Sequence, residues 1–420
     1  MGRIMKDSGL PWIGKIPAHW RCLRGKYALQ YFQKPTEESD GVITCFRDGE
    51  VTLRSNRRED GFTISEKEIG YQGIDVGDLV VHGMDGFAGS IGISDSRGKA
   101  SPVLVVLDSE ENKRFLMYYL RNLAYRDVFL ALATGIRVRS CDLRWNKIAE
   151  TVLVLPPIEE QNAIVTFIDS KLSEIDAAIK EAQELIEKYK EYKLSKVKEI
   201  FDFYLKNESY VIAKLGSLAS LVTKQTGFDY SNTISPSLVG ELTEDTLPYI
   251  QTRHFKDNYW NYETEYYIPI NVARLFPRII LDKRCLLFSI VGASIGNVAV
   301  YPGEVKAFLG GAICKVDLYE EAYYDYIKHY MMSCDGQEQI SFNIKASAQG
   351  TITVQNVRDF KIPIFKDRTI QDRISSEVDK IASKIYALIG DTENLISRLQ
   401  EYKKSIIFEY VTGKKEVPNG

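Results

Sequence analysis

Apolar residues recur at alternating spacings of three and four along two stretches of the chain, 158–207 and 367–413. In the first stretch one row consists of Ile168, Ile175, Ala182 and Tyr189, and the other of Leu172, Ile179, Ile186 and Ile200. In the second stretch the rows are Val378, Ile385, Leu399 and Ile406, and Ala382, Ile389, Ile396 and Tyr410. Lys193, Thr392 and Lys403 interrupt these rows. The heptad pattern predicts two long helices, each with the narrow apolar stripe of a coiled coil.

The two stretches are also copies of one another. EYKLS at 191–195 returns as EYKKS at 401–405, and the same step of 210 residues matches Asp169 with Asp379. Because each stripe must be covered, we expect the copies to pair as an antiparallel coiled coil, and at about 1.5 Å per residue each rod would be about 60–70 Å long. The alternative is that each helix packs on its own globular neighbour, for which a wider apolar stripe is typical. The predicted seam residues are Ile168, Leu172, Ile175, Ile179, Ile186, Val378, Ile385, Ile389, Ile396 and Leu399.

The rest of the chain predicts two globular units that are less alike than the helices. Stretches 79–94 and 285–300 both contain an apolar strand, a glycine-containing turn, Ser-Ile-Gly and a second strand, and 22–28 resembles 213–219. β-rich runs such as GVITCF and AICKVDL mix with helical patches such as ENKRFLMYYLRNL and AYYDYIKHYMM. We therefore predict an α+β fold with two globular domains, separated by the two long helices in a pseudo-twofold internal repeat.

Prolines and acidic residues indicate where the parts meet. VLVLPPIEEQ at 152–161 predicts a buried strand, two prolines that end it and a helix N-terminus, whereas KIPIFKDRTIQ at 361–371 keeps the strand and only one proline. The predicted parts are a first domain (1–157), a first long helix (158–207), a second domain (208–366), a second long helix (367–413) and a tail (414–420).

Composition and charge exclude several classes of protein. The 420 residues carry a formal net charge of −3, and six cysteines and four histidines are scattered without metal-ligand spacing or CxxC pairs. The start has no apolar leader pattern, and the longest apolar stretch, 286–300, is too short and too polar to cross a bilayer. These features predict a cytoplasmic protein with no membrane segment, no metal site and no disulfide framework.

Motifs of catalysis are absent from the sequence. GMDGFAGSIG at 83–92 departs from the GxGxxG dinucleotide fingerprint, and there is no GxxxxGK[ST], GxSxG or HExxH. A DNA methyltransferase would need a glycine loop and a [DN]PP[FYW] motif, and the chain's Pro-Pro lies in LPPIEE. Tight turns between strands are the better interpretation of the glycines. We predict no catalytic residues and no cofactor in this chain.

Cationic and amide side chains gather in segments expected to be loops of both globular units. Arg, Lys, Gln and Asn on loops suit phosphate contacts and base-edge readout. A solvated surface is the alternative, which the acids Asp48, Glu50, Glu59 and Asp60 favour. The candidate DNA contacts are Arg47, Arg54, Arg57, Arg58, Arg137 and Arg139 in the first unit, and Lys224, Gln225, Gln251, Arg253, His254 and Lys256 in the second.

Together these segments resemble a known family. LPWIGKIPAHW at 10–20, LPPIEEQ leading into a heptad helix with IDAAI, GDLVVHGM with GSIGIS, and YVTGK at 410–414 are similar to segments of the specificity subunit of Type I restriction-modification systems. The resemblance covers essentially the whole chain. It implies a non-catalytic DNA-reading subunit with two target-recognition domains, each reading one half of a split asymmetric site, and an antiparallel coiled coil that fixes their separation.

The resemblance also implies partners. These are double-stranded DNA, two methyltransferase subunits, and restriction subunits with a motor, and S-adenosylmethionine, ATP and Mg are expected only on the partner subunits. The incomplete second copy of LPPIEEQ puts the strength of the second partner contact in doubt. Lys193 and Lys403 occupy apolar heptad positions, and two interpretations are open: they end the dry seam with their stems packed, or they contact DNA or a partner.

Two other functions compete with this interpretation. A coiled-coil scaffold whose globular domains bind proteins would explain the acidic net charge but leaves the arginine-rich segments without a purpose. A self-contained DNA enzyme would be active alone with a methyl donor or magnesium. DNA affinity that falls steeply with added salt would separate the first of these from a DNA-reading subunit.

Overall fold

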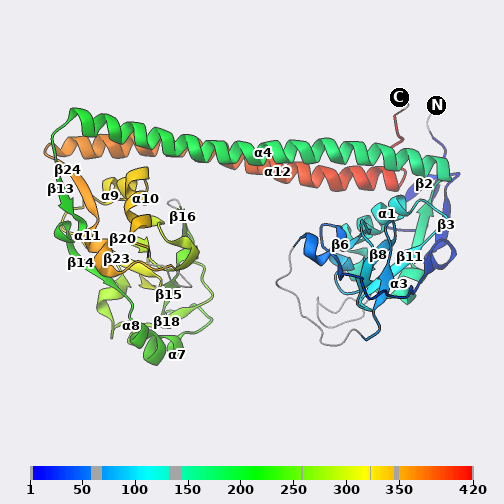
Figure 1. The fold of residues 1–420 in the computed structure, drawn as a ribbon, viewed down its shortest axis with the longest axis horizontal. Helices are drawn as coiled ribbons and strands as arrows, with labels where there is room; N and C mark the ends of the chain where they lie inside the picture. Colours follow the sequence, from blue (N-terminus) through cyan, green and yellow to red (C-terminus); the bar gives the residue numbers. More distant parts are fainter. Residues whose placement is uncertain are drawn as a thin grey trace. The chain divides into compact units, whose positions relative to one another are not determined.

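The computed structural model describes residues 3–57, 69–131, 143–256, 259–321, 323–344 and 350–418. The chain divides into two compact units, which we call unit 1 (Met1–Gln183 with Thr392–Gly420) and unit 2 (Glu184–Asp391). Both units mix helices and strands (Figure 1). The α+β class predicted from the sequence is therefore confirmed.

The two predicted long helices are confirmed as α4 (Ile158–Asn207) and α12 (Arg368–Val411), and each contributes one part to each unit. α4 begins directly after the two prolines, with Glu159 and Glu160 in its first turn. Carboxylates at this end of a helix interact favourably with the helix dipole and stabilise the helix. The parts of α4 and α12 pack side by side and antiparallel within each unit (Figure 1). Phe167 meets Tyr410 in unit 1, and Tyr204 meets Glu377 in unit 2.

Unit 1 centres on a four-stranded antiparallel sheet in the order β4-β11-β8-β9, against which α1 packs. Its helices besides the parts of α4 and α12 are α1 (Lys113–Tyr125), α2 (Val128–Ala131) and α3 (Trp145–Glu150). Its strands are β1 (Met5–Asp7), β2 (Lys15–Pro17), β3 (Arg21–Arg24), β4 (Gln30–Tyr31), β5 (Ile43–Cys45), β6 (Val51–Leu53), β7 (Gln72–Ile74), β8 (Leu79–His82), β9 (Ile91–Ile93), β10 (Gly98–Ala100), β11 (Leu104–Asp108) and β12 (Val152–Leu155).

Unit 2 centres on a four-stranded sheet in the order β14-β23-β20-β21, with α9 beside it, and adds a second sheet, β18-β15-β22-β19. Its helices are α5 (Leu215–Leu218), α6 (Gly227–Asp229), α7 (Ser235–Ser237), α8 (Ile270–Ala273), α9 (Tyr323–Met331), α10 (Cys334–Phe342) and α11 (Val354–Asp359). Its strands are β13 (Tyr210–Lys214), β14 (Ala219–Lys224), β15 (Thr246–Ile250), β16 (Phe255–Lys256), β17 (Tyr259–Trp260), β18 (Tyr267–Pro269), β19 (Ile280–Leu281), β20 (Cys285–Ser289), β21 (Val298–Tyr301), β22 (Ala307–Leu309), β23 (Ile313–Leu318) and β24 (Lys361–Phe365).

The two units repeat one topology. Each has a four-stranded antiparallel sheet whose last two strands form the hairpin predicted from the glycine-containing segments, β8-β9 in one and β20-β21 in the other. Each also has a two-stranded sheet, β12-β3 or β13-β24, that leads into a long helix. Gly89 has φ +96 in the turn between β8 and β9, a left-handed conformation in which a side chain would be strained. The glycines therefore make turns, as the sequence indicated.

The apolar stripe of the long helices is part of the cores of both units. In unit 1, Ile164, Ile168 and Ile175 of α4 and Ile406 and Val411 of α12 join the cluster around α1. In unit 2, Val197 and Phe201 of α4 and Val378 of α12 join the cluster around α9. Each compact unit therefore consists of a globular domain together with a part of each helix, and the unit boundaries fall within the helices rather than at their ends.

Among the described residues, no helix combines the length and apolar character needed to span a membrane.

Candidate functional site

Three of the predicted DNA contacts of unit 1, Arg47, Arg54 and Arg57, lie in or directly after the β5-β6 hairpin. Arg47 is 68% exposed, and one of its guanidinium nitrogens lies 2.9 Å from Asp85 Oδ1. Arg57 is held by Asp48 at 2.5 Å and by Glu50 at 3.0 Å, and its guanidinium lies 4.2 Å from the centre of the Phe46 ring. Burial opposes ionisation of Asp48, but the Arg57 hydrogen bond holds the pKa of that carboxyl below its ordinary value. The guanidinium of Arg57 is therefore held by residues of its own hairpin.

Arg54 follows β6 and places its Nε 3.5 Å from Thr44 Oγ1 on the opposite strand. The remaining predictions for this unit, Arg58, Arg137 and Arg139, lie outside the described residues. Gly49, in the turn between β5 and β6, has φ +92, and a Cβ there would meet the Arg121 guanidinium at 2.1 Å. Glycine thus allows the hairpin turn to approach α1 closely.

The predicted contacts of unit 2 divide into exposed and buried side chains. Lys224 is exposed at the end of β14, and Arg253 is half-exposed with a guanidinium nitrogen 3.1 Å from Glu265. Gln225 is buried, and its Oε1 accepts the Tyr249 hydroxyl hydrogen bond at 3.0 Å. The side chain of Lys256 lies outside the described residues.

His254 is also buried, and its Nδ1 accepts the Gln251 backbone N–H at 3.0 Å. Burial, helped by the charge of Arg253, lowers the pKa of His254, so the ring is neutral at pH 7. The burial of Gln225 and His254 does not fit the exposed role predicted for them, because both side chains serve the interior of the unit. We therefore leave both out of the proposed DNA surface.

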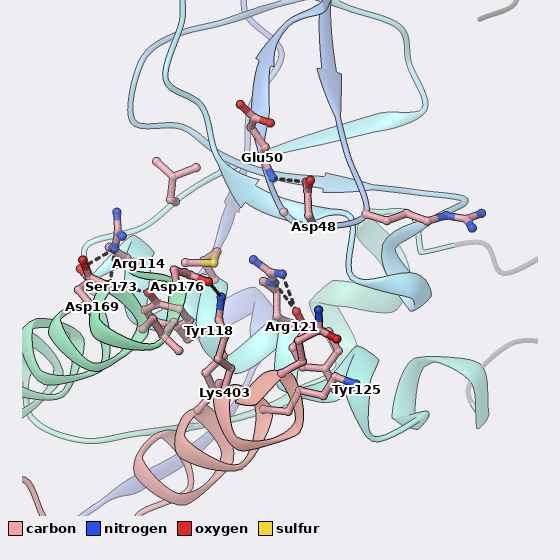
Figure 2. Close-up of a pocket in the computed structure, with 18 residues that line it drawn as sticks. Asp48, Glu50, Arg114, Tyr118, Arg121, Tyr125, Asp169, Ser173, Asp176 and Lys403 are labelled. Carbon is pink, nitrogen blue, oxygen red and sulfur yellow. Dashed lines mark hydrogen bonds and ion pairs between the residues drawn. The ribbon is translucent and has the colours of Figure 1, made fainter. Parts of the chain in front are cut away.

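A polar cleft of about 800 Å³ lies in unit 1 where the β5-β6 hairpin and α1 approach α4 and α12 (Figure 2). Lys403 of α12 donates to Asp176 of α4 at 2.5 Å, and Arg121 of α1 donates to the Tyr125 hydroxyl. Its charged lining residues are Arg47, Asp48, Glu50, Arg114, Arg121, Asp169, Asp176, Lys403 and Lys404. Charges of both signs line this cleft, so it offers no uniform field for one kind of ion.

The corresponding place in unit 2 holds a much smaller cavity, about 80 Å³. Lys193 and Tyr386 line it at positions that match Lys403 and Asp176 in the 210-residue repeat, and Lys193 donates to the Tyr386 hydroxyl at 2.8 Å. The Lys193 ammonium also lies 4.6 Å from the centre of the Tyr386 ring. Both lysines of the repeated EYKxS word therefore contact the opposite helix within their own unit.

The predicted seam residues are all at least partly buried. Ile168, Ile175, Ile186, Val378 and Ile385 are buried. The remaining five, Leu172, Ile179, Ile389, Ile396 and Leu399, are partly buried.

An exposed part of the repeat is explained by neither the seam nor the domain cores. Tyr192 and Tyr402 occupy matching positions and are 52% and 53% exposed. At about 100° per residue, they lie with their repeated neighbours in an arc of about 120° on each helix. We call this arc the outer face, and it consists of Leu185, Glu191, Tyr192 and Ser195 on α4, and Leu395, Glu401, Tyr402 and Ser405 on α12.

Two observations on the described residues concern metal binding and thiol reactivity. They contain no group of three or more His, Cys, Asp or Glu side chains placed to hold a metal ion. Burial raises the pKa of the Cys45, Cys285 and Cys314 thiols to about 12, so these cysteines stay protonated rather than acting as nucleophiles or ligands.

No protein-family model and no curated protein matches the chain. Among solved structures, it is similar to a chain from a study of complex assembly and conformational transition of the type I R-M system, with 14% identity, a TM-score of 0.66, and coverage of 95% of this chain and 99% of that chain. It is also similar to the HsdS subunit from Thermoanaerobacter tengcongensis, with 16% identity, a TM-score of 0.46, and coverage of 95% and 98%. The match at TM-score 0.66 spans nearly the whole of both chains, so the likeness is one of overall fold. The chain therefore has the overall fold of that chain from the study of a type I R-M system, the kind of system whose specificity subunit its sequence resembles.

Proposed function

We propose that this chain is the DNA sequence-specificity subunit of a type I restriction-modification complex. It reads a bipartite asymmetric DNA site through its two globular domains and positions two methyltransferase subunits, together with restriction subunits, on that site. The observation that carries the proposal is the repeat itself: one topology occurs twice, on two parts of the same antiparallel helix pair, with different surface residues in each unit.

Two unlike domains built on one scaffold suit two unlike half-sites. In this proposal the helix pair fixes the distance between the half-sites, because a paired helix is stiff and its length is set by residue number. The described residues that we assign to the DNA surface are Arg47, Arg54, Lys224, Gln251 and Arg253. Arg57 belongs to the same surface as a support for the hairpin, and the assignments of Arg58, Arg137, Arg139 and Lys256 rest on the sequence alone.

The outer face supports the proposal of two partner copies. Several exposed positions elsewhere on the helices have diverged, as at Glu187 and Ser397 or at Lys190 and Gln400. Leu185 and Tyr192 are retained as Leu395 and Tyr402 although both pairs are exposed to solvent. Exposed leucine and tyrosine that recur in one register fit two binding sites for the same protein. We assign that protein as the methyltransferase subunit.

The chemistry belongs to the partners in this proposal. S-adenosylmethionine, ATP and Mg bind the methyltransferase and restriction subunits, and this chain contributes position and sequence recognition. The methylated base is an adenine within the site, which the methyltransferase subunit removes from the stack.

The test is co-expression with the methyltransferase subunit of the same system, followed by single-molecule sequencing to map methylated adenines across a genome. We expect a split motif with a fixed non-specific spacer that disappears when this chain is deleted. A stable complex that methylates no split motif would contradict the proposal and favour the protein-binding scaffold. If the affinity of the complex for DNA does not fall as salt is raised, that would also contradict the proposal, because phosphate contacts release counterions and make DNA affinity depend on salt.

A further inference from the structure

Two carboxylates of the repeat connect the long helices to the globular domains. Asp169 of α4 and Asp379 of α12 match in the 210-residue step. In unit 1 the Asp169 carboxylate lies 2.7 Å from Arg114 Nε and accepts a hydrogen bond from the Tyr118 hydroxyl, and both partners belong to α1 (Figure 2). The contact therefore joins a long helix to the helix that packs on the central sheet of unit 1.

The same connection occurs in unit 2 with different partners. Asp379 Oδ1 lies 2.9 Å from His329 Nε2 and 3.9 Å from Lys328 Nζ, and both residues belong to α9. α9 packs beside the central sheet of unit 2 as α1 does in unit 1. The carboxylate on the long helix has thus been retained through the duplication, while its neighbours on the domain have changed from arginine and tyrosine to histidine and lysine.

The position of these carboxylates distinguishes them from residues that only hold the fold. Gln161 and Gln371 also match in the repeat but are fully buried, as interior packing requires. The side chains of Asp169 and Asp379 are 32% and 49% exposed, and partly exposed ion pairs add little to stability. Apolar contacts of Ile168 and Val378 already attach the helices to the domains. What a charged hydrogen bond adds to such a contact is direction.

We propose that Asp169 and Asp379 are positioning residues, each of which fixes the orientation of one recognition domain on the helix pair. The inference rests on the proposed function, because the oriented object is the domain that reads a half-site. The long helices supply one constant acceptor, and each domain supplies its own donors. A recognition domain can therefore change its sequence preference and keep its alignment, provided that its α1 or α9 helix presents a donor to this aspartate.

The test uses the full chain in complex with its methyltransferase subunit. Asp169→Asn and Asp379→Asn are assayed on DNA targets in which the spacer between the half-sites is one base pair shorter, correct or one base pair longer. We expect discrimination between the correct and altered spacers to fall by about fivefold in Asp169→Asn, the scale of one partly exposed ion pair. The fall should be smaller in Asp379→Asn, because burial lowers the pKa of its partner His329. Subunit stoichiometry and the midpoint of thermal unfolding should stay unchanged. Glu181→Gln and Asp391→Asn are matched controls, since they remove exposed acids at equivalent positions of the same helices.

The reciprocal exchange Arg114→Asp with Asp169→Arg should restore the spacer discrimination that Asp169→Asn loses. A purely structural role would instead lower the unfolding midpoint and would leave the spacer preference of the surviving complex intact. Unchanged spacer discrimination in both variants, with normal methylation of the correct site, would overturn the inference and leave the proposed function standing. Failure of the unaltered complex to methylate any split site would instead contradict the proposed function itself.

Discussion

At the scale of single residues, the two units use different side chains to contact the matched aspartates Asp169 and Asp379. Arg114 keeps its charge across the accessible pH range, and its Nε donates to Asp169, which also accepts a hydrogen bond from the Tyr118 hydroxyl. His329 does not keep its charge, because burial lowers its pKa below the ordinary value near 6.5, and the nearby Lys328 lowers it further. Asp379 and Asp325 act in the opposite direction but do not reverse the shift. The His329–Asp379 contact of unit 2 therefore responds to pH, whereas the Arg114–Asp169 contact of unit 1 does not.

The sign of the response follows from proton binding. Below the unfolded pKa of about 6.5 the unfolded chain takes up a proton at His329 before the folded chain does, so the free energy of unfolding falls as pH falls. We predict that His329→Gln flattens the fall of the unfolding free energy below about pH 6.5, and that denaturant unfolding at a series of pH values will show it. His82 and His254 also have lowered pKa values, but they are present in both the unaltered protein and the His329→Gln variant. The difference between the two plots of unfolding free energy against pH therefore reports His329. Parallel profiles would contradict the assignment.

Among the side chains predicted from sequence to contact DNA, the burial of Gln225 and His254 is a feature that the sequence did not indicate. Gln225 and His254 stand in polar segments, and nothing local indicates that Tyr249 covers one amide or that the other ring accepts a backbone N–H. The Arg114 and Tyr118 contacts with Asp169 join residues more than fifty positions apart, so no local pattern contains them. The sequence signal that did exist was the match between Asp169 and Asp379.

At the scale of elements, the long helices were the most predictable part of the molecule. A heptad sustained over forty or more residues has few alternatives, and the prolines before Ile158 define where α4 begins. The sequence left two alternatives, that the helices pair with each other or that each packs on its own domain. The structure shows both kinds of contact, because the same helices pair with each other and pack on the domains. Ile168 lies in the core of unit 1 and Val378 in that of unit 2. The short strands were harder to predict, since two- and three-residue strands leave no period to recognise.

The EYKxS lysines give a test at this scale. Lys193 and Lys403 occupy heptad positions that apolar residues would otherwise fill, and each reaches across to the other helix. We predict that Lys193→Leu with Lys403→Leu raises the free energy of unfolding by about 1 kcal/mol per site, because a polar heptad residue is replaced by buried apolar surface. Chemical denaturation measures the change.

Lys190→Leu is the matched control, since Lys190 is exposed and pairs with Glu187 on its own helix. DNA binding and subunit assembly should be unchanged in the double variant. Loss of either would instead assign these lysines to DNA or to a partner, the second of the two interpretations that the sequence left open.

At the scale of the whole molecule, the outer face predicts how many partners assemble. We expect Leu185→Glu with Tyr192→Glu to remove one methyltransferase subunit from the complex, and Leu395→Glu with Tyr402→Glu to remove the other, because each pair of carboxylates would be buried without a partner. Mass measurement of the purified complexes shows the loss directly. All four residues are exposed, so the helices should keep their circular dichroism.

Glu187→Lys and Ser397→Glu are controls at exposed positions that the repeat did not retain. Two copies of the methyltransferase subunit in both double variants would place the binding surface elsewhere on the chain.

The division of the long helices between the units also has a consequence for synthesis on the ribosome. Unit 2 is one continuous stretch, 184–391, whereas unit 1 needs 1–183 and 392–420. Ile406, Tyr410 and Val411 complete the core in which Ile164 and Ile168 are buried. Residues 1–183 are translated before residues 392–420, so the isoleucines of the first segment stay uncovered until the second has been made, while unit 2 can fold in between. Closing so long a loop is slow, and this uncovered apolar edge makes the nascent chain prone to aggregation.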